Sequence, residues 1–360
     1  MPTKLLLAGY FGCGNLGDDA IMLGFIQHLR TADFEVSILS GNPDETFRLY
    51  GVNSVARKDM GAVKKAILGH DCLVFPGGSI FQDVTSVRSV AYYSQLVKTA
   101  KGAGKKVAML AQGVGPLNKF LGKRMALQAY TMADIVSVRD PGSAQTLRTL
   151  GLKKKVFVTA DMAFLIPPPR EIPDQETFKI GDMHTVGLSP RPHGKGKDVV
   201  NLFGGLARLL FQAKLMPVLI EMDRAEDGPL ILEISKEQGG KIPDLRKIQT
   251  PMQLQQRIVR MDGVIAMRLH AGVLASTVSV PALMVSYDPK VAAFAKLMDM
   301  GTAPAVEGLS SQRLFDRYME FQKDRDKNQA ILERKLVEMT KLARQNIELI
   351  EEAFRPTAKI

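Results

Sequence analysis

Arg268, His270 and Lys290 follow two apolar runs of the chain, at the points where those runs end. The runs, Gly263–Met267 and Pro281–Val285, have the length and composition of buried β-strands. In a parallel sheet the carboxyl ends of the strands meet at one edge, and α/β proteins bind ligands at that edge. Two fixed cations beside an imidazole would bind an anion there and could transfer a proton near neutral pH.

A second group of basic residues follows another apolar run. Thr185–Ser189 has strand-like composition, and Arg191, His193, Lys195 and Lys197 come next in a loop that also contains glycine. An arginine at a strand end can bind phosphate or carboxylate through two parallel hydrogen bonds. We expect Arg191 to belong to the anion site, and we expect the two lysines to face solvent.

A glycine-rich loop lies near the start of the chain. Gly12–Gly17 matches the pattern G-x-G-x-x-G between an expected first strand and a helix, which is the setting of a dinucleotide-binding loop. Two observations argue against a dinucleotide. The second expected strand ends without the carboxylate that would bind ribose, and Asp18 and Asp19 would repel a pyrophosphate at the helix start. We therefore expect a sugar-like ligand whose hydroxyls Asn15 and Asp18 bind, unless the aspartates only stabilise the start of the helix.

Polar and glycine residues also follow three later apolar runs of the first half. Paired glycines and residues that could begin a helix follow Asp71–Phe75, a glutamine follows Lys106–Ala111, and Ile135–Arg139 ends in an arginine. For any one of these loops a structural role is the simpler interpretation; Arg139, for example, could pair with Asp140 next to it. Because several such loops share one rim, we expect a ligand there. The residues concerned are Gly78, Ser79, Gln82, Asp83, Gln112 and Arg139.

The alternation of apolar runs and helix-like segments predicts an α/β protein with two domains. The chain exceeds the size at which one hydrophobic core usually stops growing. Ile166–Asp174 contains four prolines, which fix the backbone and remove hydrogen-bond donors, so we expect an interdomain linker there. A C-terminal segment has apolar residues at helical spacing, and it either packs across both domains or forms a solvated helix pair. The expected boundaries are 1–166 for the first domain, 167–174 for the linker, 175–308 for the second domain and 309–360 for the helices.

Composition narrows the class of function. The net charge of +11 indicates attraction to phosphates, acidic sugars or an anionic membrane surface. Nucleic acid is not expected as a partner, because the basic residues are scattered, Trp is absent and aromatic residues make up only 6% of the chain. The two cysteines and five histidines match no zinc pattern, so we expect neither a metal nor a disulfide framework. No apolar run suits a signal peptide or a membrane span, which suggests a cytoplasmic protein with at most peripheral contact at the inner face of the membrane.

Taken in order, these motifs resemble those of the polysaccharide pyruvyl transferase family of CsaB type, from the glycine-rich start to about Ala295. The resemblance implies two Rossmann-like domains that face a cleft, as in GT-B glycosyltransferases. It also implies transfer of a pyruvyl group from phosphoenolpyruvate to a sugar as a cyclic ketal, with release of phosphate and no cofactor. The motifs that carry the resemblance are Gly9–Ala20, Gly77–Ser86, Ala111–Pro116, Ser137–Asp140, Thr159–Asp161, Met267–Ala271 and Ser286–Lys290.

The resemblance also suggests a role for each candidate residue. His270 would be the proton donor, Asp18 the base or hydroxyl anchor, and Arg268 would assist both binding and catalysis. The donor would lie on the second domain and bind Arg139, Arg191, Arg268 and Lys290. The acceptor, a saccharide that is lipid-linked or nucleotide-linked, would lie on the first domain and bind Gly12, Asn15, Gly17, Gly78, Ser79, Gln82, Asp83 and Gln112.

Three other functions fit parts of the same pattern. A GT-B glycosyltransferase would use the same fold and bind the diphosphate of a nucleotide sugar through Arg268 and Lys290. A binding protein without catalysis would recognise an anionic glycan through the polar loops and recruit partners through the C-terminal helices. A dehydrogenase would use the glycine-rich loop for NAD.

Overall fold

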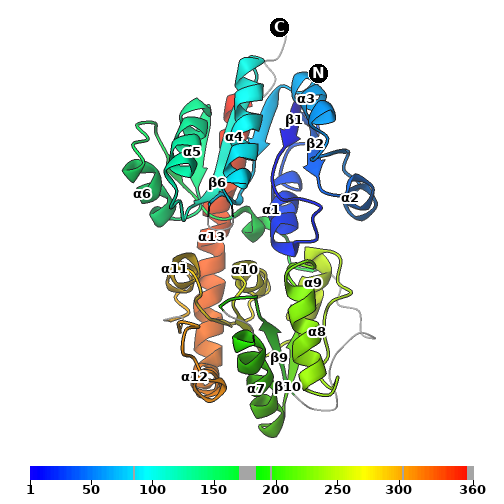
Figure 1. Ribbon diagram of the computed structural model, residues 1–360, viewed down its shortest axis with the longest axis vertical. Helices are drawn as coiled ribbons and strands as arrows, with labels where there is room; N and C mark the ends of the chain where they lie inside the picture. Colours follow the sequence, from blue (N-terminus) through cyan, green and yellow to red (C-terminus); the bar gives the residue numbers. More distant parts are fainter. Residues whose placement is uncertain (84–85, 170–183, 195–196, 302–303, 355–360) are drawn as a thin grey trace. The chain divides into compact units, whose positions relative to one another are not determined.

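The computed structural model describes residues 1–83, 86–169, 184–194, 197–301 and 304–354 (Figure 1). The chain divides into two compact units. The first unit comprises Met1–Ile166 and Met339–Ile360, and the second comprises Pro167–Glu338. Within the expected linker, residues 167–169 have no regular secondary structure and residues 170–174 lie outside the described residues.

The first unit is built on a parallel sheet with the strand order β3-β2-β1-β4-β6-β7-β8, and β5 pairs with β6. Leu5, Leu6 and Leu7 are fully buried, as expected of a parallel sheet that has both faces covered. Its strands are β1 (Thr3–Leu7), β2 (Phe34–Ser40), β3 (Ser54–Ala56), β4 (Cys72–Phe75), β5 (Gly78–Phe81), β6 (Lys106–Val114), β7 (Ile135–Val138) and β8 (Phe157–Val158). Its helices are α1 (Leu16–Ile26), α2 (Pro43–Tyr50), α3 (Met60–Gly69), α4 (Val87–Gly102), α5 (Phe120–Met132), α6 (Pro141–Thr149) and the short 3₁₀ helix η1 (Met162–Leu165).

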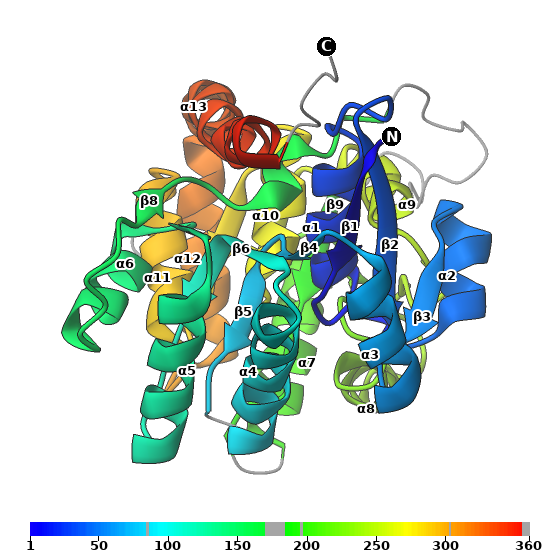
Figure 2. The same ribbon diagram turned by 90° about the horizontal axis from the view of Figure 1, so that it is seen from above.

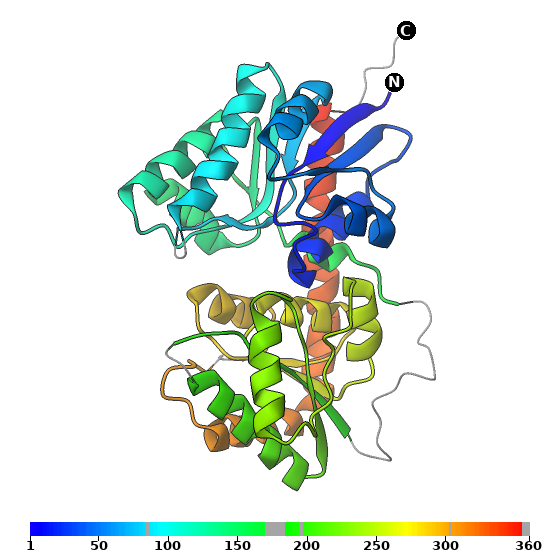
Figure 3. The same cartoon turned by 45° about the vertical axis from the view of Figure 1, so that its right-hand side comes forward.

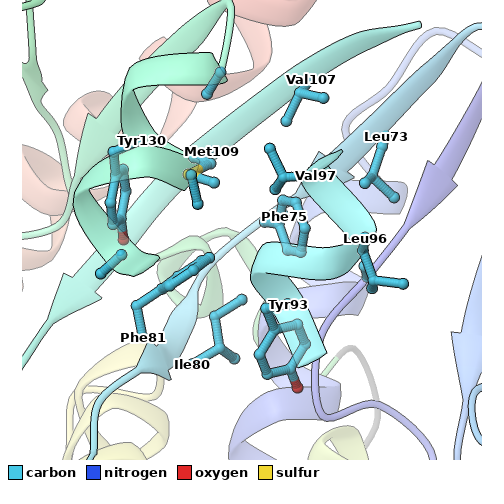
Figure 4. Close-up of a cluster of buried hydrophobic side chains, with 14 of the residues drawn as sticks. Leu73, Phe75, Ile80, Phe81, Tyr93, Leu96, Val97, Val107, Met109 and Tyr130 are labelled. Carbon is cyan, nitrogen blue, oxygen red and sulfur yellow. The ribbon is translucent and has the colours of Figure 1, made fainter. Parts of the chain in front are cut away.

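One face of the first sheet packs against α3, α4 and α5 (Figure 2). Figure 4 shows the aromatic centre of this core. The ring of Phe81 lies 6.2 Å from that of Phe75 and 5.0 Å from that of Tyr130. These buried rings fix the strands whose ends carry the candidate residues.

The end of the C-terminal helix completes the first unit. Asn346, in the part of α13 (Arg325–Phe354) that belongs to this unit, is fully buried. Its side-chain oxygen accepts from Ser137 Oγ at 2.6 Å and from Thr159 Oγ1 at 3.0 Å, and its amide donates to the carbonyl of Ala160 at 3.3 Å. The helix is therefore tied to the ends of β7 and β8.

The second unit has a smaller parallel sheet with the strand order β10-β9-β11-β12. α7 and α8 cover one of its faces together with α12, and the yellow-green α8 lies in front of the strands in Figure 3. The strands are β9 (His184–Ser189), β10 (Leu215–Leu219), β11 (Gly263–Ala266) and β12 (Ala282–Met284). The helices are α7 (Asp198–Gln212), α8 (Asp227–Glu237), α9 (Pro251–Ile258), α10 (Leu269–Thr277), α11 (Pro289–Leu297), α12 (Ser311–Lys323) and the first part of α13.

The predicted α/β class with parallel sheets is confirmed, and one local prediction is wrong. The segment after β4, expected to begin a helix, forms the strand β5, which pairs with β6. Ile80 and Phe81 are buried in the core, so their burial outweighs the polar residues that suggested a helix start. The next helix, α4, begins after Ser86, whose side chain accepts from the backbone N–H of Arg88. In the described residues no helix combines the length and the apolar character that a membrane span requires.

Candidate functional site

Four loops meet at the carboxyl edge of the second sheet. β9, β10, β11 and β12 run parallel, so the segments that follow them leave the same edge. These segments carry Arg191, the acidic stretch Glu221–Asp227, Arg268 and Lys290. His270 is half-buried in the first turn of α10. The expected cations of the second unit thus lie at the edge where parallel α/β sheets bind ligands.

Two carboxylates hold the guanidinium of Arg268. Its Nε lies 3.1 Å from both carboxylate oxygens of Asp227, and its Nη2 donates to Asp227 and, at 2.8 Å, to Glu226 Oε2. The Asp227 side chain is fully buried, that of Arg268 is 12% exposed and that of Glu226 is 48% exposed. Arg268 is therefore a fixed cation whose charge is balanced by carboxylates, a pairing that the sequence analysis did not predict.

Asp227 is itself held by the backbone. Its Oδ2 accepts from the N–H of Met222 at 3.2 Å and of Asp223 at 3.0 Å. Burial raises the pKa of Asp227 more than Arg268 and these hydrogen bonds lower it. Glu221 lies close by and is 7% exposed; burial, followed by the charge of Asp227, raises its pKa to about 7. Glu221 thus changes its charge near neutral pH.

Arg191 lies over an aromatic ring at the same edge. Its guanidinium carbon is 4.6 Å from the ring centroid of Tyr287, and its Nη2 is 3.6 Å from Glu226 Oε2. That oxygen also accepts from Arg268, so Glu226 bridges the two arginines. On the same loop His193 Nε2 lies 2.9 Å from a carboxylate oxygen of Glu307.

The lysines of the second unit have carboxylate neighbours as well. Lys290 Nζ lies 3.7 Å from Asp288 Oδ2, and the other oxygen of Asp288 caps α11 by accepting from the Lys290 N–H at 3.0 Å. Lys197 is 67% exposed and lies 3.4 Å from Glu237. Lys195 lies outside the described residues. The cations of this edge therefore come with carboxylates, and an anionic ligand must compete with them.

In the first unit the glycine-rich loop is fixed by its own polar side chains. Asn15 caps α1, because its Oδ1 accepts from the N–H of Gly17 at 3.0 Å and of Asp18 at 3.2 Å. Asp19 is 4% exposed and accepts from the Gly12 N–H at 3.0 Å, and burial raises its pKa to about 7. The buried Asp19 thus holds the backbone of the glycine-rich loop in place at Gly12.

Asp18 lies beside the glycines that follow β4. A Cβ on Gly78 would lie 3.2 Å from Asp18 Oδ1, and Gly78 has a φ of +90° that favours glycine. The structure therefore brings Asp18 and Gly78, two of the residues singled out in the sequence, to the same place at the carboxyl edge of the first sheet.

Arg139 forms a buried ion pair, although not with the neighbour considered in the sequence. Its Nη1 lies 2.7 Å from Asp161 Oδ2, and its Nη2 donates to Ser79 Oγ at 2.9 Å. The arginine and aspartate side chains are 8% and 5% exposed. Asp140 instead caps α6 by accepting from the Ser143 N–H at 2.7 Å. A local Arg139–Asp140 pair is therefore the wrong interpretation, because capping the helix engages Asp140.

Two of the candidate acceptor residues with polar side chains, Asp83 and Gln112, are buried. Asp83 is 1% exposed, and its two oxygens accept from the backbone N–H groups of Asn118 and Lys119 at 2.7 and 2.8 Å. Gln112 is fully buried; its Nε2 donates to the carbonyl of Phe75 at 3.1 Å, and its Oε1 has no hydrogen-bond partner among the described residues. Both side chains support loops at the edge of the sheet. Gln82 also lies in this region, immediately after β5.

The family of the chain follows from a comparison with protein-family models. Residues 15–289, which include the segments that follow every strand from β2 to β12, match the family described as polysaccharide pyruvyl transferase. The chain belongs to the polysaccharide pyruvyl transferase family. The matched region contains Asp18, Arg139, Arg268 and His270, and it ends at Pro289, directly before Lys290.

A curated relative of this pyruvyl transferase family member is similar over part of its length. The amylovoran biosynthesis protein AmsJ of Erwinia amylovora is 25% identical over 207 residues, which cover 45% of this chain and 49% of that protein. The chain thus spans about half the length of the curated relative that it matches.

Solved structures share the fold of this family member at low sequence identity. A putative UDP-N-acetylglucosamine 2-epimerase from Listeria monocytogenes has a TM-score of 0.67 and 12% identity, and 98% of this chain and 97% of that chain are covered. The ADP-heptose lipopolysaccharide heptosyltransferase II of E. coli has a TM-score of 0.51 and 12% identity, with 90% and 99% covered. The similarity establishes a GT-B-like, Rossmann-like fold.

One cluster at the first edge has no counterpart in the sequence analysis. Arg57 directly follows β3, and its guanidinium carbon lies 5.1 to 5.8 Å from the ring centroids of Tyr10, Tyr92 and Tyr93. It donates to Cys13 Sγ at 3.4 Å and to the hydroxyl of Tyr93 at 3.0 Å. No ion pair among the described residues includes Arg57. Because β3 has only three residues, no apolar run marks this strand end in the sequence.

Proposed function

We propose that this protein transfers a pyruvyl group from phosphoenolpyruvate to a saccharide as a cyclic ketal, in exopolysaccharide or cell-envelope biosynthesis. The observation that carries the proposal is the family match over residues 15–289, within which Arg268 and His270 lie at the carboxyl edge of the second sheet. The similarity to an amylovoran biosynthesis protein supports an exopolysaccharide as the product. We place the reaction in the cytoplasm and assign it no cofactor.

The donor binds the second unit in this proposal. Phosphoenolpyruvate carries a carboxylate and a phosphate, and Arg191 and Lys290 supply positive charge for both groups at one sheet edge. Arg268 is clamped by Asp227, which holds its guanidinium in one orientation before a ligand arrives. Asp227 is thus a positioning residue. Arg139, which the sequence analysis assigned to the donor, is buried in the first unit, where it pairs with Asp161.

His270 supplies the proton that starts the reaction. Protonation of the methylene carbon of phosphoenolpyruvate makes its C2 electrophilic, and a sugar hydroxyl then forms a C–O bond at C2 and loses its proton. A second hydroxyl forms the other C–O bond as the bond between C2 and the phosphate oxygen breaks, and its proton goes to the leaving phosphate, so inorganic phosphate leaves and the ketal closes. Imidazole suits the first step because it gives and accepts protons near neutral pH. Asp18 accepts a hydroxyl proton.

The acceptor binds the first unit. Gly12, Asn15, Gly17 and Gly78 shape the loops beside Asp18, and Ser79 and Gln82 lie on or after β5 at the same edge. Asp83 and Gln112, which are buried, act by holding these loops. The Arg57 cluster adds aromatic rings and a cation that forms no ion pair with the residues that the structure describes, which suits a saccharide with an acidic group.

The test is ligand-induced thermal stabilisation followed by a phosphate-release assay. Phosphoenolpyruvate should raise the melting temperature, because a ligand that binds only the folded state stabilises it. Lys290→Ala should lose much of this effect, whereas His184→Ala, which removes an exposed imidazole at the start of β9, should keep it. Phosphate release from phosphoenolpyruvate with a saccharide acceptor should depend on His270 and vanish in His270→Gln. Stabilisation by nucleotide sugars alone, or full turnover in His270→Gln, would contradict the proposal.

A further inference from the structure

The start of α5 exposes two adjacent large apolar side chains. Phe120 is 79% exposed and Leu121 is 56% exposed. Single exposed apolar residues are common on protein surfaces, but two neighbours at the tip of a helix form a patch that soluble surfaces usually avoid. The patch therefore indicates a binding surface.

Basic side chains surround this apolar pair. Lys119, Lys123 and Arg124 are all exposed, and none of them forms an ion pair within the described residues. No aspartate or glutamate occurs from Val114 to Met132. The tip therefore combines exposed apolar side chains with basic side chains that form no ion pair among the described residues.

The chain holds this tip in place. Asp83 accepts from the backbone N–H groups of Asn118 and Lys119, directly before the exposed pair. Gly122 completes the fit, because a Cβ there would lie 2.4 Å from Asp83 Oδ2. Asp83 is buried beneath the turn and is 1% exposed, so it does not face the ligand. Phe120 and Leu121 are thus presented from a fixed turn.

We propose that residues 118–124, the α5 tip, bind the surface of an anionic lipid bilayer. Phe120 and Leu121 insert at the boundary between headgroups and acyl chains, and Lys119, Lys123 and Arg124 contact lipid phosphates. A protein partner fits less well, because two apolar side chains are too few for the core of a stable protein interface. α5 follows β6, so its start lies at the carboxyl edge of the first sheet, where a saccharide carried on a membrane lipid would arrive.

The test measures binding of the full chain to vesicles, without donor or acceptor, so that it is independent of the proposed function. The protein should sediment with vesicles of phosphatidylcholine mixed with phosphatidylglycerol, bind vesicles of phosphatidylcholine alone far less, and dissociate as salt is added. Phe120→Ser combined with Leu121→Ser should weaken binding at least about tenfold. Lys123→Gln and Arg124→Gln should each weaken it about fivefold.

Matched variants separate the tip from general effects. Leu232→Ser removes an apolar side chain that is 52% exposed on α8, and Lys64→Gln removes an exposed lysine from α3. Both should bind vesicles like the wild type, and circular dichroism should show unchanged melting for every variant used. The proposal is overturned if the wild type ignores anionic vesicles at low salt, if lipid charge has no effect, or if the Phe120 and Leu121 double variant binds normally.

Discussion

The two carboxylates that hold Arg268 should differ in how much they contribute to stability. Asp227→Asn leaves the guanidinium with 12% exposure and without its buried counterion, which should lower the free energy of unfolding by about 3 kcal/mol. This loss lies at the lower end of the range that is usual when one partner of a buried ion pair is removed, because burial already raises the pKa of Asp227 more than Arg268 lowers it. Glu226→Gln removes a carboxylate that is 48% exposed, and its cost should stay below about 1 kcal/mol.

The same pair should separate stability from ligand binding. Glu226 lies 2.8 Å from Arg268 and 3.6 Å from Arg191, so it competes with any anion for both. Removing its charge should strengthen the binding of phosphoenolpyruvate by about 1 kcal/mol, or about fivefold. This is the energy of attraction between a carboxylate and a guanidinium at about 4 Å in a water-like medium, which the bound anion would no longer have to replace. Asp227→Asn should instead weaken binding, because the guanidinium loses its fixed orientation.

Urea unfolding and isothermal titration with phosphoenolpyruvate measure the two effects. Glu226→Asp is a useful control, since it keeps the charge and shortens the side chain. The reasoning is wrong if Asp227→Asn unfolds at the wild-type urea concentration, or if Glu226→Gln binds phosphoenolpyruvate more weakly than the wild type does.

Three further perturbations follow from buried groups. The raised pKa of Glu221 should make the stability of the wild type fall by at most about 3 kcal/mol as pH rises from about 4.5 to about 7. Glu221→Gln should reduce this decline in melting curves recorded at several pH values, and an unchanged decline would count against the role of Glu221. Gly113→Ala should lower stability by about 1 to 3 kcal/mol and displace the buried guanidinium of Arg139, because the added Cβ would lie within 3 Å of Arg139 and of Ser79 Oγ, whereas Gly69→Ala, with open space around it, should not. Asn346→Ala should cost about 2 kcal/mol in urea unfolding, because it removes the oxygen that accepts from the buried hydroxyls of Ser137 and Thr159, and a loss equal to that of the exposed control Glu348→Ala would argue against this role.

The long apolar runs of the chain predicted its sheets well. The expected strand Thr185–Ser189 coincides with β9 except for its first residue, and the apolar run Gly263–Met267 contains β11. Two short strands escaped detection, because β3 has three residues and no apolar run around them, and β5 begins with glycine. A strand of that length is specified by its partner in the sheet more than by its own sequence.

The candidate residues were found by their position after strands, but their partners were not. Asp227 and Arg268 are separated by 41 positions and lie on different loops, so no local pattern links them. Arg139 likewise pairs with Asp161 across 22 positions, while the adjacent Asp140 caps a helix. Sequence spacing indicates which side chains reach an edge, whereas the ion pairs there depend on tertiary packing.

The first unit is assembled from segments at opposite ends of the sequence, and this affects how it can fold during synthesis. Thr3 donates its hydroxyl to the carbonyl of Phe354, 351 positions away, and Asn346 closes the ends of β7 and β8. Contacts of such sequence separation form slowly because a long loop must close first. During translation, the first unit therefore cannot be completed until the whole second unit and the end of α13 have been synthesised. A fragment that ends at Ile166 would leave Ser137 and Thr159 without their buried partner and should be prone to aggregate.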